Sequence, residues 1–390
     1  MTTVQNGLWT RRAEARIRTH QPTFAEFFAG IGLVRLGLER AGWRVAFAND
    51  IDDKKFRQYD AHFGDAHEHF RLGDVHALDA VDMPTVDLAT ASFPCTDLSV
   101  AGGRRGLNSG ESSAFWGFHR LLVRMGDRRP RLVMLENVVG FLTSHGGADF
   151  AQAMRALSDL GYSVDPFVMD ARWFVPQSRP RLFVVGELGG PRNADCSESR
   201  TRPGQLTRFI REHPEIAWGL RALPEPPMRS SNSLRDILDE LPADDAAWWS
   251  PDRVAYLYGQ MSAKHQSWVL QHVDRGAWSH GTVFRRVRVQ ADGTKRSMGE
   301  LRVDGVAGCL RTPKGGSGRQ ILFQTGYGEM RARLLTPHEC ARLMGADGFR
   351  VTGSLNDALF GFGDAVCATV IEWIATHRLN HPAQRIHEST

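Results

Sequence analysis

The chain has 390 residues, 42% of them hydrophobic and 24% charged, and a formal net charge of +4, which is ordinary for a soluble globular protein. No apolar run approaches the roughly 18 residues that a membrane span requires. The five cysteines are an odd number without a C-x-x-C pair, which argues against a disulfide framework and against a zinc site. We therefore expect a cytoplasmic protein that binds neither a metal nor a membrane, and its length predicts two units or one unit with an insertion.

Residues 1–22 are a basic tail without the apolar core and cleavage site of a secretory signal. From residue 23 to residue 190, short apolar runs alternate with longer amphipathic ones. This alternation predicts an α/β fold, a mostly parallel Rossmann-like sheet with helices on both faces. We expect strands at 23–30, 43–50, 131–138, 162–170 and 180–188, two more strands ending near 75 and 94, and helices at 33–42 and 52–63.

The pattern changes after Gly189. Residues 191–326 are rich in Trp, Pro, Arg and Gly and lose the alternation, which indicates a smaller inserted domain. One hairpin is legible within 283–297, around an Asp-Gly turn. Helical patterns return at 333–345 and 362–379, so we expect residues 327–390 to rejoin the domain formed by 23–190.

Polar and small residues stand at the carboxyl end of each predicted strand of the large sheet, where open parallel sheets bind ligands. The glycines at 30 and 32 lack the third glycine of a dinucleotide fingerprint, but Asp50 follows 18 residues after Gly32, about where an acid would bind a ribose. A nucleoside ligand without a pyrophosphate fits this pattern, and S-adenosylmethionine is one. For Asp50 or Asp74 taken alone, a helix cap or turn acid is the favoured interpretation.

Eight short motifs carry a family resemblance. In order and spacing, "FFAGIG", "NDID", "GDV", "SFPCTDLS", "LENV", "QSRPR", "RLLTPHECARLMG" and "GDAV" resemble the motifs of the DNA (cytosine-5)-methyltransferases. The resemblance covers nearly the whole chain outside the tail and the insert. It implies methylation of a cytosine at C5 in double-stranded DNA with S-adenosylmethionine, by an enzyme of a restriction-modification or phage-defence system, with restriction or defence proteins as partners and a monomeric chain.

The resemblance makes Cys95 the nucleophile. A thiolate added at cytosine C6 turns C5 into an attacking carbon, and a thiolate is favoured near a cation or a helix N-terminus. Without the motifs, Cys95 would be read as a packing residue, because free cysteines are often buried. Glu136 would hold N3 and the exocyclic amine, and Arg181, assisted by Arg179, would bind the carbonyl oxygen. The catalytic set is completed by the neighbouring strand-end residues Pro94 and Asn137.

The same resemblance places the cofactor. It implies Phe28 and Ile51 on the two faces of the adenine, Asp74 on its amine, Asp50 on the ribose, and Asp364 and Val366 at the methionine end. The sequence departs from the family at Asp50, where Glu is usual, at Thr96, where Gln is common, and at Asp364, where Asn is usual and the change adds a negative charge. The remaining cofactor residues are Ala29, Gly30, Ile31 and Gly32 in the turn, and Pro94 and Phe115.

The resemblance implies that the insert is the target-recognition domain. A base inside a duplex must be swung out before Cys95 can reach it, so part of the chain must hold the flanking DNA. Basic residues around the hairpin would grip the DNA, so we expect binding to weaken steeply with salt. A solvated basic hairpin is the alternative. Methylation of transfer RNA and a non-catalytic regulator are the rival functions. The DNA-binding candidates are Arg285, Arg286, Arg288, Lys295, Arg296, Arg311, Lys314 and Arg319.

Overall fold

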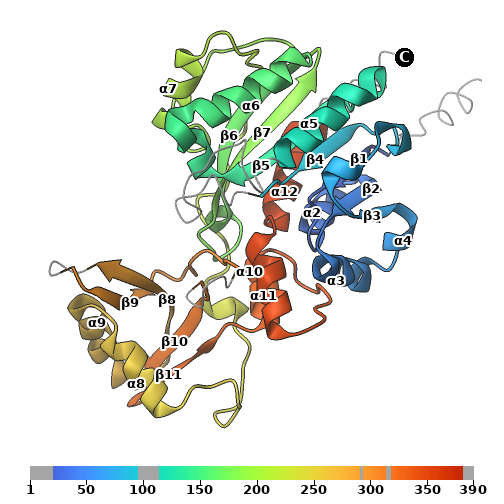
Figure 1. Cartoon of the computed structure of the whole chain (residues 1–390). Helices are drawn as coiled ribbons and strands as arrows, with labels where there is room; N and C mark the ends of the chain where they lie inside the picture. The colour runs from blue at the N-terminus through green and yellow to red at the C-terminus, as the bar shows by residue number, and fades with distance from the viewer. Residues whose placement is uncertain (1–20, 95–113, 290–292, 313–317, 381–390) are drawn as a thin grey trace, which may run out of the picture.

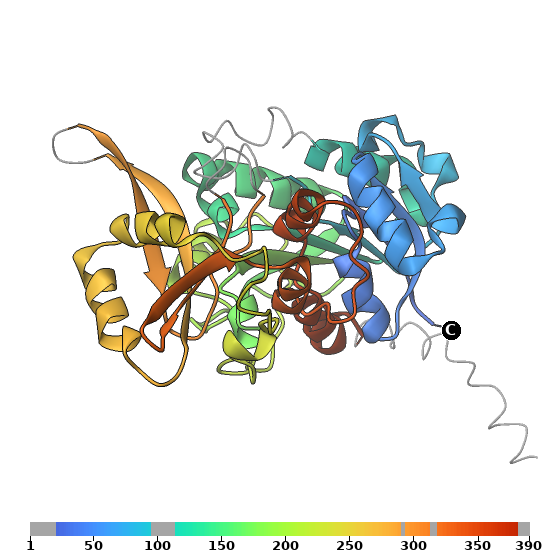
Figure 2. The ribbon, with the colours of Figure 1, turned by 90° about the horizontal axis from the view of Figure 1, so that it is seen from below.

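The computed structural model describes residues 21–94, 114–289, 293–312 and 318–380. A large α/β domain and a smaller lobe make up this part of the chain (Figure 1). Seen from below, the C-terminal helices lie between the small lobe and the first strands and helices of the large domain (Figure 2). Cys95 and Lys314, and Asp292 of the predicted turn, lie outside the described residues.

The large sheet has seven strands in the order β3-β2-β1-β4-β5-β7-β6. Neighbouring strands are parallel from β3 through β5, whereas β7 runs antiparallel to both β5 and β6. The predicted α/β fold with a mostly parallel sheet is therefore confirmed. The strands are β1 Thr23–Phe27, β2 Arg44–Asp50, β3 Phe70–Leu72, β4 Leu88–Ala91, β5 Leu132–Val138, β6 Tyr162–Asp170 and β7 Pro180–Leu188.

Both faces of this sheet are covered, which explains its nearly continuous apolar strands. On β1, Phe24 packs into one core, while Ala25 and Phe27 pack into the other, as the alternation of side chains along a strand requires. Helices α2 and α12 contribute to the first core, and α5 and α6 to the second. The helices of this domain are α2 Leu33–Arg40, α3 Asp53–Phe63, α4 Ala66–His69, α5 Ala114–Met125, α6 Ala148–Asp159, α7 Gly204–Glu212, α10 Pro337–Leu343, α11 Leu355–Asp364 and α12 Ala368–Ile374.

The small lobe is an antiparallel sheet in the order β11-β10-β8-β9 with two helices packed on it. The predicted hairpin is confirmed, because β8 and β9 pair from Thr282 opposite Arg302 to Val289 opposite Lys295. The elements of the lobe are α8 Pro251–Gly259, α9 Ala263–Val273, β8 Ser279–Val289, β9 Lys295–Arg302, β10 Ile321–Gly326 and β11 Glu329–Leu334.

Two predicted helices have different bounds. The pattern at 333–345 begins as the end of β11, and the helix starts only at Pro337, because Thr336 caps it and Glu339 completes a capping box. The pattern at 362–379 belongs to two helices: α11 ends at Asp364 and α12 begins at Ala368, continuing as a π-helical turn over Ala375–Leu379.

The expected domain boundaries at 190 and 326 do not coincide with the ends of the hydrophobic cores. Leu206 and Ile210 of α7 and the later Trp218 belong to the second core of the large domain. Trp218 also forms a bridge with Val164 of β6. At the other end, β11 belongs to the small sheet, which therefore extends to Leu334.

One helical run, Leu355–Leu379, is long and apolar enough to cross a membrane by length and composition alone. It consists of α11, α12 and the π-helical turn, and 67% of its most apolar window is buried inside the fold. Residues such as Phe362, Ile371 and Leu379 pack in the first core of the large domain. The run is thus explained by core packing.

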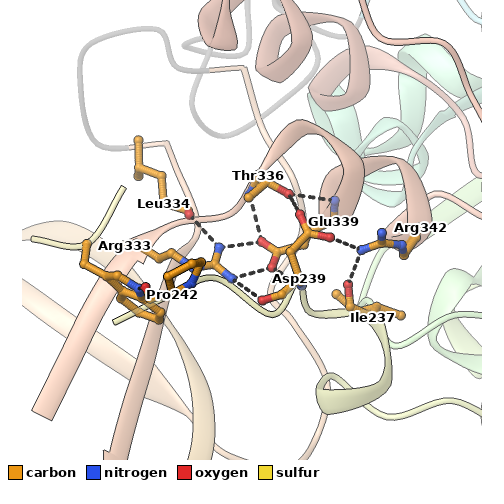
Figure 3. A network of polar contacts seen from close by, with 9 residues as sticks. Ile237, Asp239, Pro242, Arg333, Leu334, Thr336, Glu339 and Arg342 are labelled. Atoms are coloured by element: carbon orange, nitrogen blue, oxygen red, sulfur yellow. Dashed lines mark hydrogen bonds and ion pairs between the residues drawn. The ribbon is translucent and has the colours of Figure 1, made fainter. Parts of the chain in front are cut away.

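A buried polar network joins the last strand of the small lobe to α10 (Figure 3). The guanidinium of Arg333 donates to both carboxylate oxygens of Glu339, at 2.7 and 2.5 Å, and both side chains are fully buried. The Thr336 N–H also donates to Glu339, at 2.8 Å. Asp239, in the segment that leads to α8, accepts from the hydroxyl of Thr336 and from Arg342. This network fixes β11 against the helix that returns to the large domain.

Candidate active site

A cavity of about 610 Å³ lies at the carboxyl ends of β1, β2, β4 and β5, and α11 and the turn after it contribute to its wall. This is the edge at which parallel sheets bind ligands, and the volume is typical of a small-molecule site. Most of the predicted site residues meet here although they come from distant parts of the chain. The predicted residues that line the cavity are Phe28, Ala29, Gly30, Asp50, Ile51, Asp74, Pro94, Glu136, Asn137, Arg179, Arg181, Asp364 and Val366.

Three predicted cofactor residues lie behind the cavity wall. Ile31 is fully buried in the first core, and Phe115 is fully buried in the second, where its ring packs against Phe93 at 5.5 Å between centroids. Gly32 starts α2 with φ +83°, and a Cβ there would lie 2.5 Å from the ring of Phe63 on α3. These residues support the turn, and the structure gives none of them a place on the wall.

The acids predicted to hold the nucleoside are themselves held by the backbone. The carboxylate of Asp50 accepts from the Gly30 N–H and from the Asp52 N–H, both at 2.8 Å. Burial raises the pKa of Asp50, and Lys55 and these two N–H groups oppose that rise. Asp74 caps a short 3-10 turn by accepting from the His76 N–H at 2.8 Å. Both acids thus have the turn role that the sequence left open, and each oxygen keeps a second lone pair for a ligand.

The wall has features that suit an adenosine ligand. Ile51 is 70% exposed although it is a large apolar residue, and it lies on the wall together with the half-buried Phe28. Phe28 itself has φ +58°, which is rare for a residue with a side chain. An aromatic base between two apolar side chains would cover this exposed surface. The acids beside it provide acceptors for ribose hydroxyls and an amine, so the residues present fit S-adenosylmethionine.

A salt bridge that sequence reasoning missed crosses this cavity. Lys55 of α3 donates from Nζ to Oδ2 of Asp364 at the end of α11, at 2.7 Å. Burial would lower the pKa of Lys55, but the carboxylates of Asp364 and Asp50 outweigh burial and raise it. The extra negative charge at position 364 is therefore matched by a local positive charge.

At the other end of the cavity, Glu136 and Arg181 form a buried pair. Arg181 Nε lies 3.1 Å from Glu136 Oε1, and the two side chains are 16% and 9% exposed. They come from β5 and β7, which pair so that Val138 lies opposite Arg181. Burial raises the pKa of Glu136, while Arg181 and Arg179 hold that rise back. The result is a carboxyl group that can carry a proton and a planar cation beside it.

Asn137 fixes the place where β4 leads out towards the predicted nucleophile. Its Nδ2 donates to the Phe93 carbonyl at 3.1 Å, and its Oδ1 accepts from the Val138 N–H at 2.8 Å. Pro94 lines the cavity at the end of this described segment. Asn137 therefore positions the backbone directly before Cys95.

Arg179, predicted to assist Arg181, joins its own segment to two distant parts of the chain. Its Nη1 donates to the Leu310 carbonyl at 2.8 Å and contacts Cys309 Sγ at 3.3 Å. Its Nη2 donates to the Gly363 and Ala365 carbonyls at 2.9 and 2.6 Å. All four Nη donors are thus used, and the side chain is only 2% exposed. The geometry favours a positioning role for Arg179.

The thiol of Cys309 contacts Arg179. Burial would raise the pKa of Cys309, but Arg179, Arg181 and Arg311 outweigh burial and lower it. Sequence reasoning missed Cys309, because it lies 130 residues after Arg179 and outside the motifs.

The predicted DNA-binding residues divide between the two faces of the hairpin. Arg288 lies opposite Arg296 and shares its face with Arg286, whereas Arg285 and Lys295 have the opposite parity and lie on the other face. On the first face, Arg286 and Arg288 both approach Glu300, at 3.4 and 2.6 Å.

The first face is linked to the cavity. The guanidinium groups of Arg286 and Arg311 lie 5.3 and 5.1 Å from the ring centroid of Phe284. The backbone of Arg311 packs against Gly363 so closely that a Cβ at Gly363 would lie 2.6 Å away. Arg319, by contrast, donates to Asn356 at the start of α11. We name Arg286, Arg288, Arg296 and Arg311 the basic strip.

Comparison with known proteins shows the family to which the chain belongs. A family model for the C-5 cytosine-specific DNA methylases matches residues 22–379. The chain is 26% identical over 363 residues to the type II methyltransferase M.DsaV of Dactylococcopsis salina, covering 93% of this chain and 87% of that protein. It is 35% identical to M.BsuFI of Bacillus subtilis over 42% of this chain and 39% of that protein. The crystal structure of S. pombe Dnmt2 methyltransferase shares the fold, with a TM-score of 0.60 at 16% identity over 93% of this chain and 99% of that one. The chain belongs to the C-5 cytosine-specific DNA methylase family and transfers a methyl group from S-adenosylmethionine to C5 of cytosine in DNA.

Proposed function

We propose that the chain methylates a cytosine swung out of a specific double-stranded DNA sequence, through a covalent bond between Cys95 and C6. The observation that carries the proposal is the buried Glu136–Arg181 pair, which lies on the same cavity wall as the residues that fit the cofactor. A planar cation and a carboxyl group side by side match the carbonyl oxygen and the N3–amine edge of cytosine.

The reaction follows from these residues. The Cys95 thiolate adds to C6 while Glu136 provides the proton that N3 takes up, and Arg181 binds the carbonyl oxygen as electron density builds in the ring. C5 then attacks the methyl carbon that S-adenosylmethionine would supply, and the bond from that carbon to the positively charged sulfur breaks with its electrons staying on the sulfur. Loss of the C5 proton to water expels the thiolate, and N3 returns its proton to Glu136, which restores the ring. Asn137 and Arg179 hold the surrounding loops in place.

A fluorinated substrate tests the covalent step. DNA whose cytosines carry fluorine at C5 is expected to stay bound to the protein under denaturing conditions when S-adenosylmethionine is present. Fluorine cannot leave as a proton does, so the thiolate cannot be expelled. Cys95→Ala is expected to give no such adduct. Cys309→Ser is the matched control, because it removes the thiol that contacts Arg179, and it should still form the adduct. Loss of the adduct in the control alone would identify Cys309 as the nucleophile.

The basic strip is our candidate for the DNA-binding surface. Swinging a base out of the duplex costs a few kcal/mol, and contacts to the flanking DNA must offset that cost. The strip begins beside Gly363 on the cavity wall and continues through Arg311 and Phe284 onto the hairpin. The opposite face, with Arg285 and Lys295, has no such connection among the described contacts.

Substitutions of two adjacent residues of β9, one on each face, test which face of the hairpin binds DNA. Arg296→Ala is expected to weaken DNA binding and to reduce the slope of the affinity against salt by about one phosphate contact, because it removes a charge from the strip. Lys295→Ala removes an equally exposed charge from the other face and should leave both quantities nearly unchanged. Filter binding over a salt series measures both. A larger effect of Lys295→Ala would assign the DNA to the opposite face.

We also propose the biological setting. Because M.DsaV and M.BsuFI are named type II methyltransferases, we propose a restriction-modification or phage-defence role with a cognate nuclease, a monomeric chain and a cytoplasmic location.

A further inference from the structure

An ion pair in the cavity joins Asp364, which is expected at the methionine end of the cofactor, to Lys55, for which the sequence predicted no role. Lys55 Nζ and Asp364 Oδ2 are 2.7 Å apart, and both residues line the cavity. The Asp364 side chain is 49% exposed and that of Lys55 is 18% exposed, so the pair is covered on the protein side and open to a ligand. The described contacts use one of the three ammonium donors of Lys55 and one carboxylate oxygen of Asp364.

We propose that Lys55 and Asp364 together recognise the amino-acid end of S-adenosylmethionine, with Lys55 binding its carboxylate and Asp364 its ammonium. The inference rests on the proposed function; it adds Lys55, for which the sequence predicted no role, and it gives a role to the negative charge of Asp364. An amino-acid end carries both charges on one carbon, so it can lie against a close ion pair with each charge facing its opposite. A neutral residue at position 364 would offer the ammonium only a partial charge.

The other cationic side chains that line the described cavity wall already bind groups of the protein itself. The lysine and arginine side chains on the described wall are Lys55, Arg179 and Arg181. The four Nη donors of Arg179 bind backbone carbonyls and a thiol, and Arg181 is paired with Glu136 at the far end. Lys55 is therefore the cation positioned to receive a carboxylate.

A second ion pair between the same two helices shows what a purely structural pair looks like. Lys54 Nζ lies 3.0 Å from Asp357 Oδ1, so it also joins α3 to α11. Lys54 is 72% exposed and neither residue of this pair lines the cavity. This pair is the matched control, because it shares the helices and the chemistry but has no access to the ligand.

The test is calorimetric binding of two ligands to the full-length protein. S-adenosylhomocysteine has the amino-acid end, and methylthioadenosine has the same adenosine and sulfur without it. Lys55→Met is expected to weaken S-adenosylhomocysteine about tenfold or more and to leave methylthioadenosine little changed. Asp364→Asn should weaken the first ligand less, and combining the two changes should recover part of the Lys55→Met loss, since an unpaired Asp364 repels the ligand carboxylate. Lys54→Met should change neither ligand.

Equal weakening of the two ligands by Lys55→Met would show that the pair only shapes the cavity, and no weakening would show that it does not meet the ligand. Either result overturns the proposal and leaves the proposed function standing. If the unmodified protein bound neither ligand, the cofactor assignment itself would fail. Thermal unfolding of each variant confirms that the fold is intact.

Discussion

Glu136→Gln is expected to lower the rate of methyl transfer by roughly 10²- to 10⁴-fold, the usual contribution of a positioned proton donor. Glutamine keeps the shape and burial of the side chain, but it cannot supply a proton to N3 as the thiolate adds to C6. Single-turnover methylation of DNA measures the loss. Binding of S-adenosylhomocysteine should not change, because Glu136 lies at the opposite end of the cavity from Lys55 and Asp364 in the proposed arrangement.

The dependence on pH adds a second readout for the same residue. Burial raises the pKa of Glu136, so the protonated form persists to a higher pH than in an ordinary carboxyl group. As the pH rises through that pKa the proton is lost, and the rate should fall. Glu136→Gln has no proton to lose and should lack this fall. A variant within a few-fold of the unmodified enzyme, with the same pH profile, would contradict the role given to Glu136.

Glu339→Gln is expected to destabilise the protein by about 3–5 kcal/mol, because it leaves the buried guanidinium of Arg333 without its partner charge. Glutamine can still complete the capping box of α10, so the loss would come mainly from the unpaired charge. Replacing both members, as in Arg333→Met with Glu339→Leu, should cost less than the sum of the single changes. Urea unfolding monitored by circular dichroism gives the free energies.

The control for this prediction is an ion pair on β11, the strand that also carries Arg333. Arg331 and Glu329 form an ion pair at 2.7 Å, but their side chains are 29% and 54% exposed. Glu329→Gln should therefore cost no more than about 1 kcal/mol. Glu339→Gln could instead lower the free energy of unfolding as little as Glu329→Gln does. The network of Figure 3 would then not be what stabilises the packing of β11 against α10.

The sequence predicted the large sheet and most of the cavity wall for one physical reason. Strands buried on both faces are apolar throughout, so polar residues such as Asp50, Asp74 and Glu136 stand out where each strand ends. Parallel strands then place these ends at one edge. The strand-end part of the wall was therefore predictable without knowing the strand order, whereas Arg181, Asp364 and the roles of the residues came from the family resemblance. What the alternation did not reveal was which neighbours support the wall, and Ile31 and Phe115 belong to that group.

The features of the site that the sequence did not predict depend on contacts between distant segments of the chain. Lys55 and Asp364 are 309 residues apart, so only the packing of α3 against α11 shows that the unusual Asp has a lysine partner. Arg179 belongs to a recognisable motif, but the carbonyl groups that accept hydrogen bonds from its guanidinium belong to residues 310, 363 and 365. The division of the hairpin arginines between two faces depends on the register of β8 and β9, which the Asp-Gly turn suggested without fixing.

The most direct test of the central claim is to incubate the purified protein with unmethylated genomic DNA and S-adenosylmethionine and to map 5-methylcytosine at single-base resolution. The proposed function predicts methylation of one cytosine in one short recurring sequence, absent from Cys95→Ala. Methylation of transfer RNA with none on DNA, or no methylation although DNA and cofactor both bind, would contradict it.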